Sequence, residues 1–587
     1  MTIFRPPPNS SAPQLHAAAE KFFRAAWEIA PQDLALEQVL MDELGLAPLL
    51  ARTLVGRGMT DPGIVEKFLN PSEDQFNDPA LLPDYRAAVD LILAARDSKD
   101  LIFIHGDYDV DGVSSAALLS RFLGKIGCNV HTHVPHRMKE GYGIHTSAVD
   151  SAQELGAKLF LTCDCGSSAL YQIKKAKALG MKVLVTDHHE LKEEWPEADA
   201  FVNPHRPDSK YPFAVLCGAG VAFKLCEGIA KEAGFKLHQF YRAYLDLATL
   251  GTVSDVMPLV NENRIIVALG LQHVASSNKA GIKALVEKTS KSARFTARTI
   301  GFQLGPRLNA AGRLDDASIS LALLLTNDMD EARAIAEQLD FFNEQRKAET
   351  QRMIREAQLM IEKDNMLDHP VLVVGGEDWH PGIIGNVASK LVESYYRPAF
   401  VVSLEHGKGS ARSISGYHLA DALNRTTKLL KSHGGHEMAA GFALDPKKVP
   451  EFREALQADA GATISADQLI RRLHIDAIVK LNEVTVKSLG HLTRMEPFGQ
   501  ANPEPVFMSE EITVEKIMPT SNPDHFRLVL RDPETRESVK AMAFGMPQFI
   551  AQIKEGSTIS TAYTAEIDTY GGYESVKLTI KDLAVQS

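Results

Sequence analysis

The sequence predicts an α/β multidomain protein: a parallel-sheet domain, a long connecting helix, a second α/β domain and a C-terminal β-barrel. Three observations support this order. From residue 101, short apolar runs alternate with helical stretches, a pattern typical of βαβ units and a parallel sheet. A charged amphipathic stretch over 328–364 contains neither Pro nor Gly and predicts one long helix. After residue 465, β-rich runs between turn signals favour a small barrel.

Length and composition set limits on the class of protein. With 587 residues, the chain is too long for one hydrophobic core, so three or four domains are expected. No apolar run nears the roughly 20 residues that cross a bilayer, and Met1–Pro13 lacks the apolar core of a signal peptide. Five cysteines without framework spacing favour a reducing, cytoplasmic compartment. We therefore expect a cytoplasmic protein with no membrane partner.

The elements follow in order along the chain. The Ala/Leu-rich N-terminal region is expected to be helical with a loose tail. Strands of the parallel sheet are predicted at 101–104, 159–162 and 182–186. Strands of the barrel are predicted at 512–517, 525–531, 538–544, 557–567 and 574–580. The predicted regions are 1–75 (N-terminal, helical), 76–325 (first α/β domain), 326–368 (connecting helix), 369–464 (second α/β domain) and 465–587 (barrel).

The most informative motif is HGDYDVDG at 105–112, directly after an apolar run. Asp107, Asp109 and Asp111 occupy every second position, so their carboxylates would share one face if the strand continued. Three like charges repel strongly in a low-dielectric site, and a divalent cation would hold them. A solvated acidic turn is the alternative. A calcium loop does not fit, because its twelfth position is Leu118 rather than Glu and a strand precedes it.

A further carboxylate, Asp164, follows the predicted strand 159–162. Its neighbours Cys163 and Cys165 form a Cys-x-Cys pair, and without a second pair this is a weak zinc signal. We interpret the cysteines as small packed side chains and Asp164 as the polar group at the end of the strand. This position is where open α/β sheets bind ligands.

Asp187-His188-His189 follows the next strand, 182–186, and Asp255 follows Leu250–Ser254. One imidazole can bind metal while Asp187 orients it, and the other can contact a substrate phosphate. Carboxylates with one or two imidazoles favour manganese or magnesium over a thiolate zinc site. Two such ions about 4 Å apart are the usual apparatus for attack on phosphorus. No GxxxxGK[ST] loop occurs, so ATP hydrolysis is not indicated.

The order of these motifs, followed by GGHEMAAGF at 434–442, resembles the DHH phosphoesterase superfamily with its DHHA1 domain. HGDYDVDG, GPRLNAAGRL at 305–314, WHPGIIG at 379–385 and GSARS at 409–413 resemble more closely the RecJ family. This resemblance covers the chain from about residue 75. It implies a single-stranded-DNA-specific exonuclease that degrades 5′ to 3′ with two Mn²⁺ or Mg²⁺ ions in DNA recombination and repair.

The resemblance also implies roles for individual residues. His189 would contact the substrate phosphate, and Asp187 would fix a histidine tautomer without binding metal. His105 is left open between a metal ligand and a hydrogen-bonding support. The metal ligands would be a subset of Asp107, Asp109, Asp111, Asp164, His188 and Asp255.

Residues outside the metal cluster resemble the family's DNA-binding positions. Arg307, Asn309 and Arg313 correspond to DNA contacts, although for Arg313 a salt bridge to Asp315 or Asp316 is the alternative. Guanidinium and hydroxyl groups suit a phosphate dianion. The pocket for the terminal 5′ phosphate would contain Ser410, Arg412 and Ser413.

Gly434-Gly435-His436 resembles a glycine-rich substrate motif in which the backbone approaches the phosphodiester and His436 donates to phosphate. A strand-to-helix turn with a capping histidine is the alternative. The β-rich tail resembles an OB-fold, which binds single strands by aromatic stacking and a basic groove. We assign none of its aromatic residues to DNA.

The family further implies a single-stranded-DNA-binding protein and a RecQ-type helicase as partners, and the chain is expected to be monomeric. A net charge of −12 does not exclude a DNA substrate, since a local basic groove decides binding. A DHH phosphodiesterase acting on nanoRNA or cyclic dinucleotides is the alternative function, although such enzymes typically lack the barrel. A non-catalytic DNA-binding scaffold would have lost ligands, and here every acidic and histidine position is filled.

Overall fold

The computed structural model describes residues 2–4, 25–136, 140, 143–289, 294–569 and 572–585. The chain forms two compact units. One contains residues 68–346 with 495–503, and the other contains 1–67, 347–494 and 504–587. None of the described helices is both long and apolar enough to cross a membrane.

The first unit is built on a five-stranded sheet in the order β4-β3-β5-β6-β7. Every neighbouring pair is parallel, which confirms the predicted fold class. In β3, Ile102 and Ile104 enter one core while Phe103 enters the other, as alternation along a strand requires. The strands are β3 (Leu101–Gly106), β4 (Asn129–His133), β5 (Leu159–Cys163), β6 (Lys182–Thr186) and β7 (Ala200–Val202).

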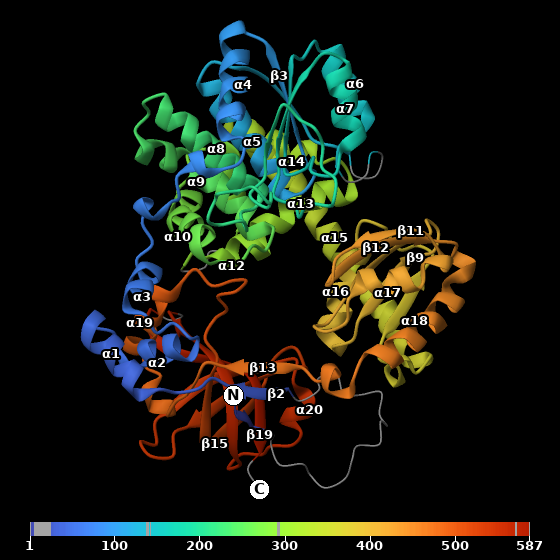
Figure 1. Cartoon of the computed structure of the whole chain (residues 1–587). Helices are drawn as coiled ribbons and strands as arrows, with labels where there is room; N and C mark the ends of the chain where they lie inside the picture. Colours follow the sequence, from blue (N-terminus) through green and yellow to red (C-terminus); the bar gives the residue numbers. More distant parts are fainter. Residues whose placement is uncertain are drawn as a thin grey trace. The chain divides into compact units, whose positions relative to one another are not determined.

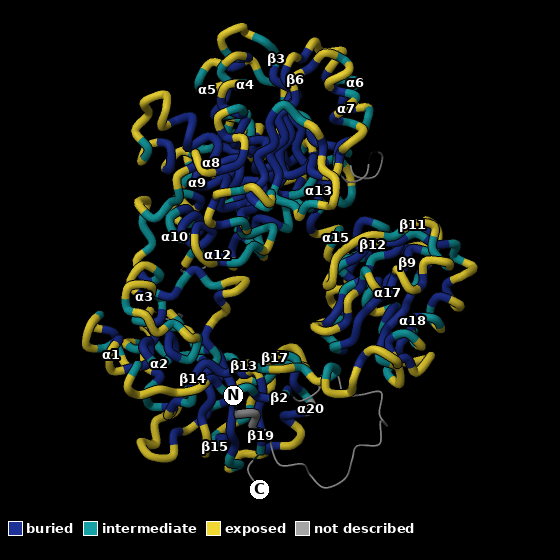
Figure 2. The backbone as a smooth tube through the Cα atoms, viewed as in Figure 1, coloured by how far each residue is buried: buried dark blue, intermediate teal, exposed yellow. Residues whose placement is uncertain are grey.

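Helices cover both faces of this sheet (Figure 1). Its strands β3, β5, β6 and β7 are almost entirely buried (Figure 2), whereas the edge strand β4 is partly exposed. One face carries α4 (Tyr85–Ser98), α5 (Val110–Lys125) and α8 (Gly218–Glu232), and the other carries α6 (Thr146–Glu154) and α7 (Leu170–Ala178). The unit continues with α9 (Leu237–Ser254), α10 (Asn261–Ala275), α11 (Ala280–Glu287), α12 (Ala297–Thr299), the π-helical η3 (Ile300–Leu304), α13 (Gly305–Leu314) and α14 (Ser318–Leu325).

The predicted long helix is present as α15 (Met329–Lys363). The boundary between the two units falls inside it, between Arg346 and Lys347. Its first turn carries Asp330 and Glu331, and its last turn carries Lys363. This charge distribution complements the helix dipole.

The second unit contains a five-stranded sheet in the order β11-β12-β10-β9-β8. Its β8 and β9 are parallel, whereas the other neighbouring pairs are antiparallel. Its helices are α16 (Ile384–Tyr395), α17 (Leu419–Arg425) and α18 (Val449–Thr463). Its strands are β8 (Leu372–Gly376), β9 (Ala399–Ser403), β10 (Lys408–Arg412), β11 (Leu430–Gly435) and β12 (Ala439–Leu444).

The predicted barrel is confirmed. Its strands run in the order β15-β16-β17-β19-β18, and pairing of β15 with β18 closes it. Closure removes the exposed sheet edges. The short β14 (Ala477–Ile478) pairs with β15, and α19 (Val486–Leu492) follows it in sequence. The strands are β15 (Phe507–Pro519), β16 (His525–Arg531), β17 (Ser538–Phe544), β18 (Thr558–Asp568) and β19 (Ser575–Val585).

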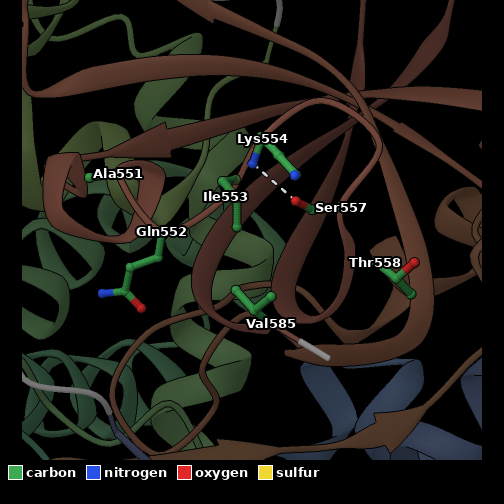
Figure 3. Close-up of a pocket in the computed structure, with 7 residues that line it drawn as sticks. All are labelled: Ala551, Gln552, Ile553, Lys554, Ser557, Thr558 and Val585. Carbon is green, nitrogen blue, oxygen red and sulfur yellow. Dashed lines mark hydrogen bonds between the residues drawn. The ribbon is translucent and has the colours of Figure 1, made fainter. Parts of the chain in front are cut away.

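An open pocket of about 450 Å³ lies on the barrel beside α20 (Pro547–Ile550). Figure 3 shows Ile553, Lys554, Ser557 and Val585 among the residues that line it. The backbone N–H of Lys554 donates to Ser557 Oγ at 3.0 Å. None of the candidate metal or DNA residues named above lines this pocket.

The N-terminal region differs from the helical expectation. It contains α1 (Leu34–Leu44), α2 (Pro48–Gly56) and α3 (Pro62–Leu69), but also the strand β2 (Ala26–Ile29). This strand pairs with β1 (Thr2–Phe4) and, in parallel, with β13 (Arg472–Ile475). Trp27 is buried and its Nε1–H donates to Asp582 Oδ2 at 2.7 Å. The local pattern could not reveal this strand, because its parallel partner β13 lies more than 400 residues away in the chain.

Candidate active site

The aspartates of the HGDYDVDG motif do not continue the strand, which corrects the expected alternation on one face. β3 ends at Gly106, and Asp109 is the N-cap of α5. Its Oδ1 accepts the backbone N–H of Asp111 at 2.9 Å and of Gly112 at 3.1 Å. The aspartates therefore lie on a tight strand-to-helix turn. The bonds to Asp109 stabilise this turn, because they satisfy N–H groups at the start of the helix.

A second helix terminus holds Asp111. Its two carboxylate oxygens accept the backbone N–H groups of Gly218 at 2.6 Å and Ala219 at 2.9 Å. These are the first residues of α8, where the partial positive charge of a helix favours an anion. The carboxylate is thus fixed from the backbone of a different βα segment.

Two glycines, which the sequence reasoning missed, leave space for this arrangement. A Cβ on Gly251 would lie 2.3 Å from Asp111 Oδ1, and a Cβ on Gly218 would lie 2.5 Å from the Asp164 Cβ. No side chain fits at either position without displacing a carboxylate. The signal in the sequence was a glycine four residues before Asp255 and a glycine at the start of a helix.

The predicted metal ligands converge at the carboxyl ends of the strands. In each of three groups, the ligand atoms lie within 4.8 Å of one another. Asp164 and His188 belong to more than one group, so the groups overlap and form a single cluster. The groups are Asp107, Asp109 and Asp164; Asp111, His188 and Asp255; and Asp164, His188 and His189.

His188 lies at the centre of the second group. Its Nε2 is 3.1 Å from Asp164 Oδ1, and it is 3.8 Å from both Asp111 Oδ2 and Asp255 Oδ2. Two ligand atoms on one octahedral ion, each about 2.1 Å from it, are about 3 Å apart. The Asp164–His188 separation therefore fits two ligands of one divalent ion.

Without a cation the cluster is electrostatically unfavourable. Burial, followed by repulsion from Asp111, raises the pKa of Asp164 well above its usual range. The same causes raise the pKa of Asp109, and they raise the pKa of Asp255 to about 8. Asp164 Oδ1 is buried and has no hydrogen-bond partner among the described residues. A bound divalent cation would supply the positive charge that this cluster needs.

Backbone conformation is unusual at two of these positions. Asp164 has φ of +59°, and Val256, directly after Asp255, has φ of +56°. Aspartate tolerates the left-handed region, but a β-branched valine rarely adopts it. Such strain persists where the surrounding structure enforces it, and it occurs often at active sites.

Asp187 lies beside the cluster and binds His189. Its Oδ1 is 2.8 Å from His189 Nδ1 and accepts the backbone N–H groups of His188 and His189, while Oδ2 accepts that of Ser167. Burial opposes the charged forms of both side chains, but their hydrogen bond outweighs it. It lowers the pKa of Asp187 and raises the pKa of His189 to about 9. The carboxylate thus fixes His189, which is 38% exposed, in a form that donates from Nε2.

His105 is buried beside the cluster but belongs to none of the three groups. Its Nδ1 lies 3.1 Å from Nδ1 of His133, and the two rings stack. Burial and then His133 lower its pKa to about 3, so the ring is neutral. Cys163 and Cys165 are buried, and burial raises the pKa of both thiols. They pack as small side chains, as the sequence predicted.

The predicted DNA residues of the first unit lie on α13. Asn309 Oδ1 accepts the backbone N–H of Val110 at 3.2 Å. This bond joins α13 to the aspartate turn, the strand-to-helix turn at 107–111. Arg307 forms an ion pair with Asp340 at 2.7 Å, donates to the Gln303 carbonyl at 2.7 Å and is only 12% exposed. Arg313 is partly exposed near the end of the same helix.

The predicted phosphate pocket lies in the second unit. Arg412 Nη1 donates to Ser410 Oγ at 3.3 Å, and both side chains face the first turn of α16. A Cβ on Gly385 would lie 3.2 Å from Ser410 Oγ and 3.4 Å from Arg412 Nη2. Ser413 does not join them, because it is buried and its hydroxyl donates to the Tyr417 carbonyl at 2.6 Å.

The glycine-rich motif forms the hairpin between β11 and β12 rather than a strand-to-helix turn. Gly434, Gly435 and His436 are exposed. The backbone N–H of His436 donates to the Ala439 carbonyl at 2.9 Å. An exposed backbone with little side-chain bulk can approach a phosphodiester closely.

Comparison with family models identifies three domains in this chain. Family models match as the DHH family, N-terminal domain, over 101–252, the DHHA1 domain over 368–462 and the RecJ OB domain over 475–582. The single-stranded-DNA-specific exonuclease RecJ of Bacillus subtilis is 36% identical over 95% of this chain and 71% of that protein. The Escherichia coli protein of the same name is 32% identical over 92% of this chain and 96% of its own length.

Solved structures agree. RecJ from Thermus thermophilus in complex with Mn²⁺ matches with a TM-score of 0.81 and 28% identity, over 96% of this chain and 80% of that chain. The same protein in complex with Mg²⁺ matches with a TM-score of 0.75, 27% identity and coverage of 96% and 78%. Motifs, site geometry, domain content and overall similarity lead to one conclusion: this chain belongs to the RecJ family of single-stranded-DNA-specific exonucleases.

Proposed function

We propose that this chain hydrolyses the phosphodiester bonds of single-stranded DNA from the 5′ end, in DNA recombination and repair. The main observation that supports this proposal is the single cluster in which Asp164 and His188 are shared between groups of possible metal ligands. Two Mn²⁺ or Mg²⁺ ions held there would activate a water and neutralise charge on the phosphoryl oxygens. The fit rests on buried oxygen and imidazole donors whose charges repel one another without a cation.

The protein's own residues have distinct tasks in this proposal. Asp107, Asp109, Asp111, Asp164, His188 and Asp255 hold the ions. Asp187 keeps Nδ1 of His189 protonated and its ring oriented, so that Nε2 faces the substrate phosphate. His105 supports the cluster from its buried position beside His133. Arg307, Asn309, Arg313 and His436 contact the DNA backbone.

Polarity would come from capture of the terminal 5′ phosphate. Ser410 and Arg412 lie against the N-terminal turn of α16, where backbone N–H groups and the helix dipole favour a phosphate. The guanidinium adds charge-assisted hydrogen bonds. Ser413 directly follows Arg412 in the chain, but its hydroxyl donates to the Tyr417 carbonyl rather than facing this pocket.

We further propose the domain assignment 1–75, 76–325 (DHH), 326–368 (connecting helix), 369–464 (DHHA1) and 465–587 (OB-fold), which the family matches support. Also proposed are a cytoplasmic location, a monomeric state and an interaction with a single-stranded-DNA-binding protein and a RecQ-type helicase. Light scattering tests the monomer, and co-purification of tagged protein with each partner tests the interactions.

The decisive experiment digests 5′-labelled and 3′-labelled single strands and duplex with Mn²⁺, Mg²⁺ or chelator. We expect early release of the 5′ label, loss of activity with chelator and little attack on duplex. Asp111→Ala should abolish nucleotide release while DNA binding persists. Undiminished activity in that variant would overturn the assignment. Preferred cleavage of a dinucleotide or cyclic dinucleotide over a long strand would favour the alternative phosphodiesterase.

A further inference from the structure

An exposed aromatic side chain on the segment that leads into α13 has no role in the assignment above. Phe302 is 73% exposed, although its neighbours Ile300 and Leu304 are fully buried. It lies in η3, a short π-helical turn, and such turns occur frequently at functional sites. The buried neighbours anchor the turn and leave the ring on the surface.

Arg298 accompanies this ring. Its guanidinium carbon lies 5.3 Å from the centroid of the Phe302 ring, within the range of a cation–π interaction. Arg298 is itself exposed, and no carboxylate in the described part of the chain forms an ion pair with it. An exposed ring beside an uncompensated cation is the combination that binds unpaired nucleotides, by stacking on the base and attraction of the phosphate.

Contacts of η3 and α13 connect the segment that carries Phe302 to the segments that carry the proposed metal ligands. η3 packs against α9, which ends at Ser254 just before Asp255. A Cβ on Gly305 would lie 2.8 Å from Ser254 Oγ. Further along the same run, Asn309 binds the aspartate turn through the Val110 N–H. Phe302 precedes Asn309 by seven residues, which is about 10 Å along a helix at 1.5 Å per residue.

We propose that Phe302 and Arg298 form a stacking platform for an unpaired base of the strand that the metal cluster cleaves. This inference rests on the proposed function. In a duplex each base is stacked and paired, so it cannot lie on the ring without first leaving the helix. The platform therefore favours single strands without reading sequence.

A second exposed aromatic residue in the same unit is less suited to this role. Trp195 lines an open pocket with Lys192 and His205. The same pocket carries Glu190 and Glu193, whose charges oppose the approach of a phosphate backbone. The charged group that contacts the Phe302 ring is the guanidinium of Arg298, which would attract a phosphate.

The test compares Phe302→Ala, Phe302→Trp and Arg298→Gln with the wild type. Loss of stacking on one base should raise KM for a single strand by about 5- to 150-fold, while kcat changes by less than about twofold. Phe302→Trp should keep the KM of the wild type, because the indole ring can also stack on a base. Affinity for Mn²⁺ and the unfolding temperature should stay at wild-type values, because the ring is exposed and binds no metal.

Phe235→Ala is the matched control. This phenylalanine is 40% exposed and follows the C-terminal end of α8, whose N-terminus binds Asp111. The helix places it about 22 Å from the cluster. Its KM should be that of the wild type.

Binding of a strand containing 2-aminopurine separates this inference from the proposed function. Stacking on Phe302 should change the fluorescence in the wild type and not in Phe302→Ala. If the wild type released no nucleotides, the proposed function would fail, whatever the fluorescence. If the wild type is active but Phe302→Ala keeps its KM and its fluorescence change, the platform is overturned.

Discussion

Nδ1 of His189 lies 2.8 Å from Oδ1 of Asp187, and the same oxygen accepts the backbone N–H of His188 at 2.7 Å. One carboxylate thus orients the ring proposed to contact phosphate and fixes the backbone of His188, a proposed metal ligand. In the proposed mechanism, Asp187 would couple substrate contact by His189 to metal binding by His188.

Asp187→Asn should separate these two tasks. The amide keeps an oxygen for the backbone N–H groups but loses the charge that raises the pKa of His189. We expect kcat to fall by about 10- to 100-fold, as for other residues that support a metal site. Calorimetric titration with Mn²⁺ should show a smaller change in affinity. Full activity at pH 7.5 would contradict the role assigned to Asp187.

Gly251→Ala should disturb the cluster of proposed metal ligands without replacing any ionisable residue. The added methyl would lie 2.3 Å from Asp111 Oδ1 and 2.5 Å from the Cβ of Ala219, so the carboxylate must move. We expect Mn²⁺ affinity to fall at least about tenfold, measured by calorimetry, and nucleotide release to fall with it.

Gly124→Ala is the control for that substitution. Gly124 lies in α5, and a Cβ there meets nothing within 4 Å. It should raise stability by about 0.4–1 kcal/mol, since alanine restricts the unfolded chain. Equal losses of Mn²⁺ affinity in both variants would show that the effect is not local to the cluster.

Stability of the metal-free protein should depend on pH in a defined direction. Burial and mutual repulsion raise the folded-state pKa of Asp109, Asp164 and Asp255. Such groups contribute stability below their ordinary pKa near 4, and this contribution is lost as pH rises through the folded value, about 8 for Asp255. With chelator, the unfolding temperature should therefore fall between pH 6 and pH 8.5.

Manganese should oppose this fall of the unfolding temperature with pH, because protons compete less with the ion for the carboxylates at higher pH. The increase in unfolding temperature with Mn²⁺ should be larger at pH 8.5 than at pH 6. Asp255→Asn should weaken the pH dependence seen with chelator. An increase of unfolding temperature with pH in metal-free wild type would contradict the electrostatic account.

Arg412→Gln should reduce discrimination at the 5′ end. Loss of a charged hydrogen bond to phosphate is worth about 10- to 150-fold in binding. We expect that loss in kcat/KM for 5′-phosphorylated strands and little change for strands with a 5′ hydroxyl. Lys408 is an exposed cation on the same strand. Lys408→Gln should leave the ratio of kcat/KM for 5′-phosphorylated and 5′-hydroxyl strands unchanged. If this ratio fell equally in both variants, a dedicated pocket at Arg412 would be refuted.

Arg307→Ala tests whether an arginine that is ion-paired with Asp340 also binds DNA. A lost phosphate contact should reduce the log–log salt slope of single-strand binding by about 0.7. Asp340→Ala breaks the ion pair but keeps the cation, so its slope should match the wild type. A lower unfolding temperature with an unchanged slope in Arg307→Ala would assign the residue to stability alone.

Much of the architecture was predictable because the relevant patterns are local. Short apolar runs between helical stretches predicted β3, β5 and β6, and a stretch without Pro or Gly predicted α15. The strand β2 was missed, because its pairing with β13 joins opposite ends of the chain. The fold class follows from periodicity, whereas this long-range pairing does not.

The residue types also predicted the kind of site, because carboxylates and imidazoles after successive strands indicate a divalent metal. Only the tertiary structure decided their arrangement. It ends β3 at Gly106, fixes Asp111 on the N-terminus of α8, and uses Gly218 and Gly251 to admit the carboxylates. Those contacts join segments more than 50 residues apart, and close packing between distant segments follows from the folded backbone rather than from any local pattern.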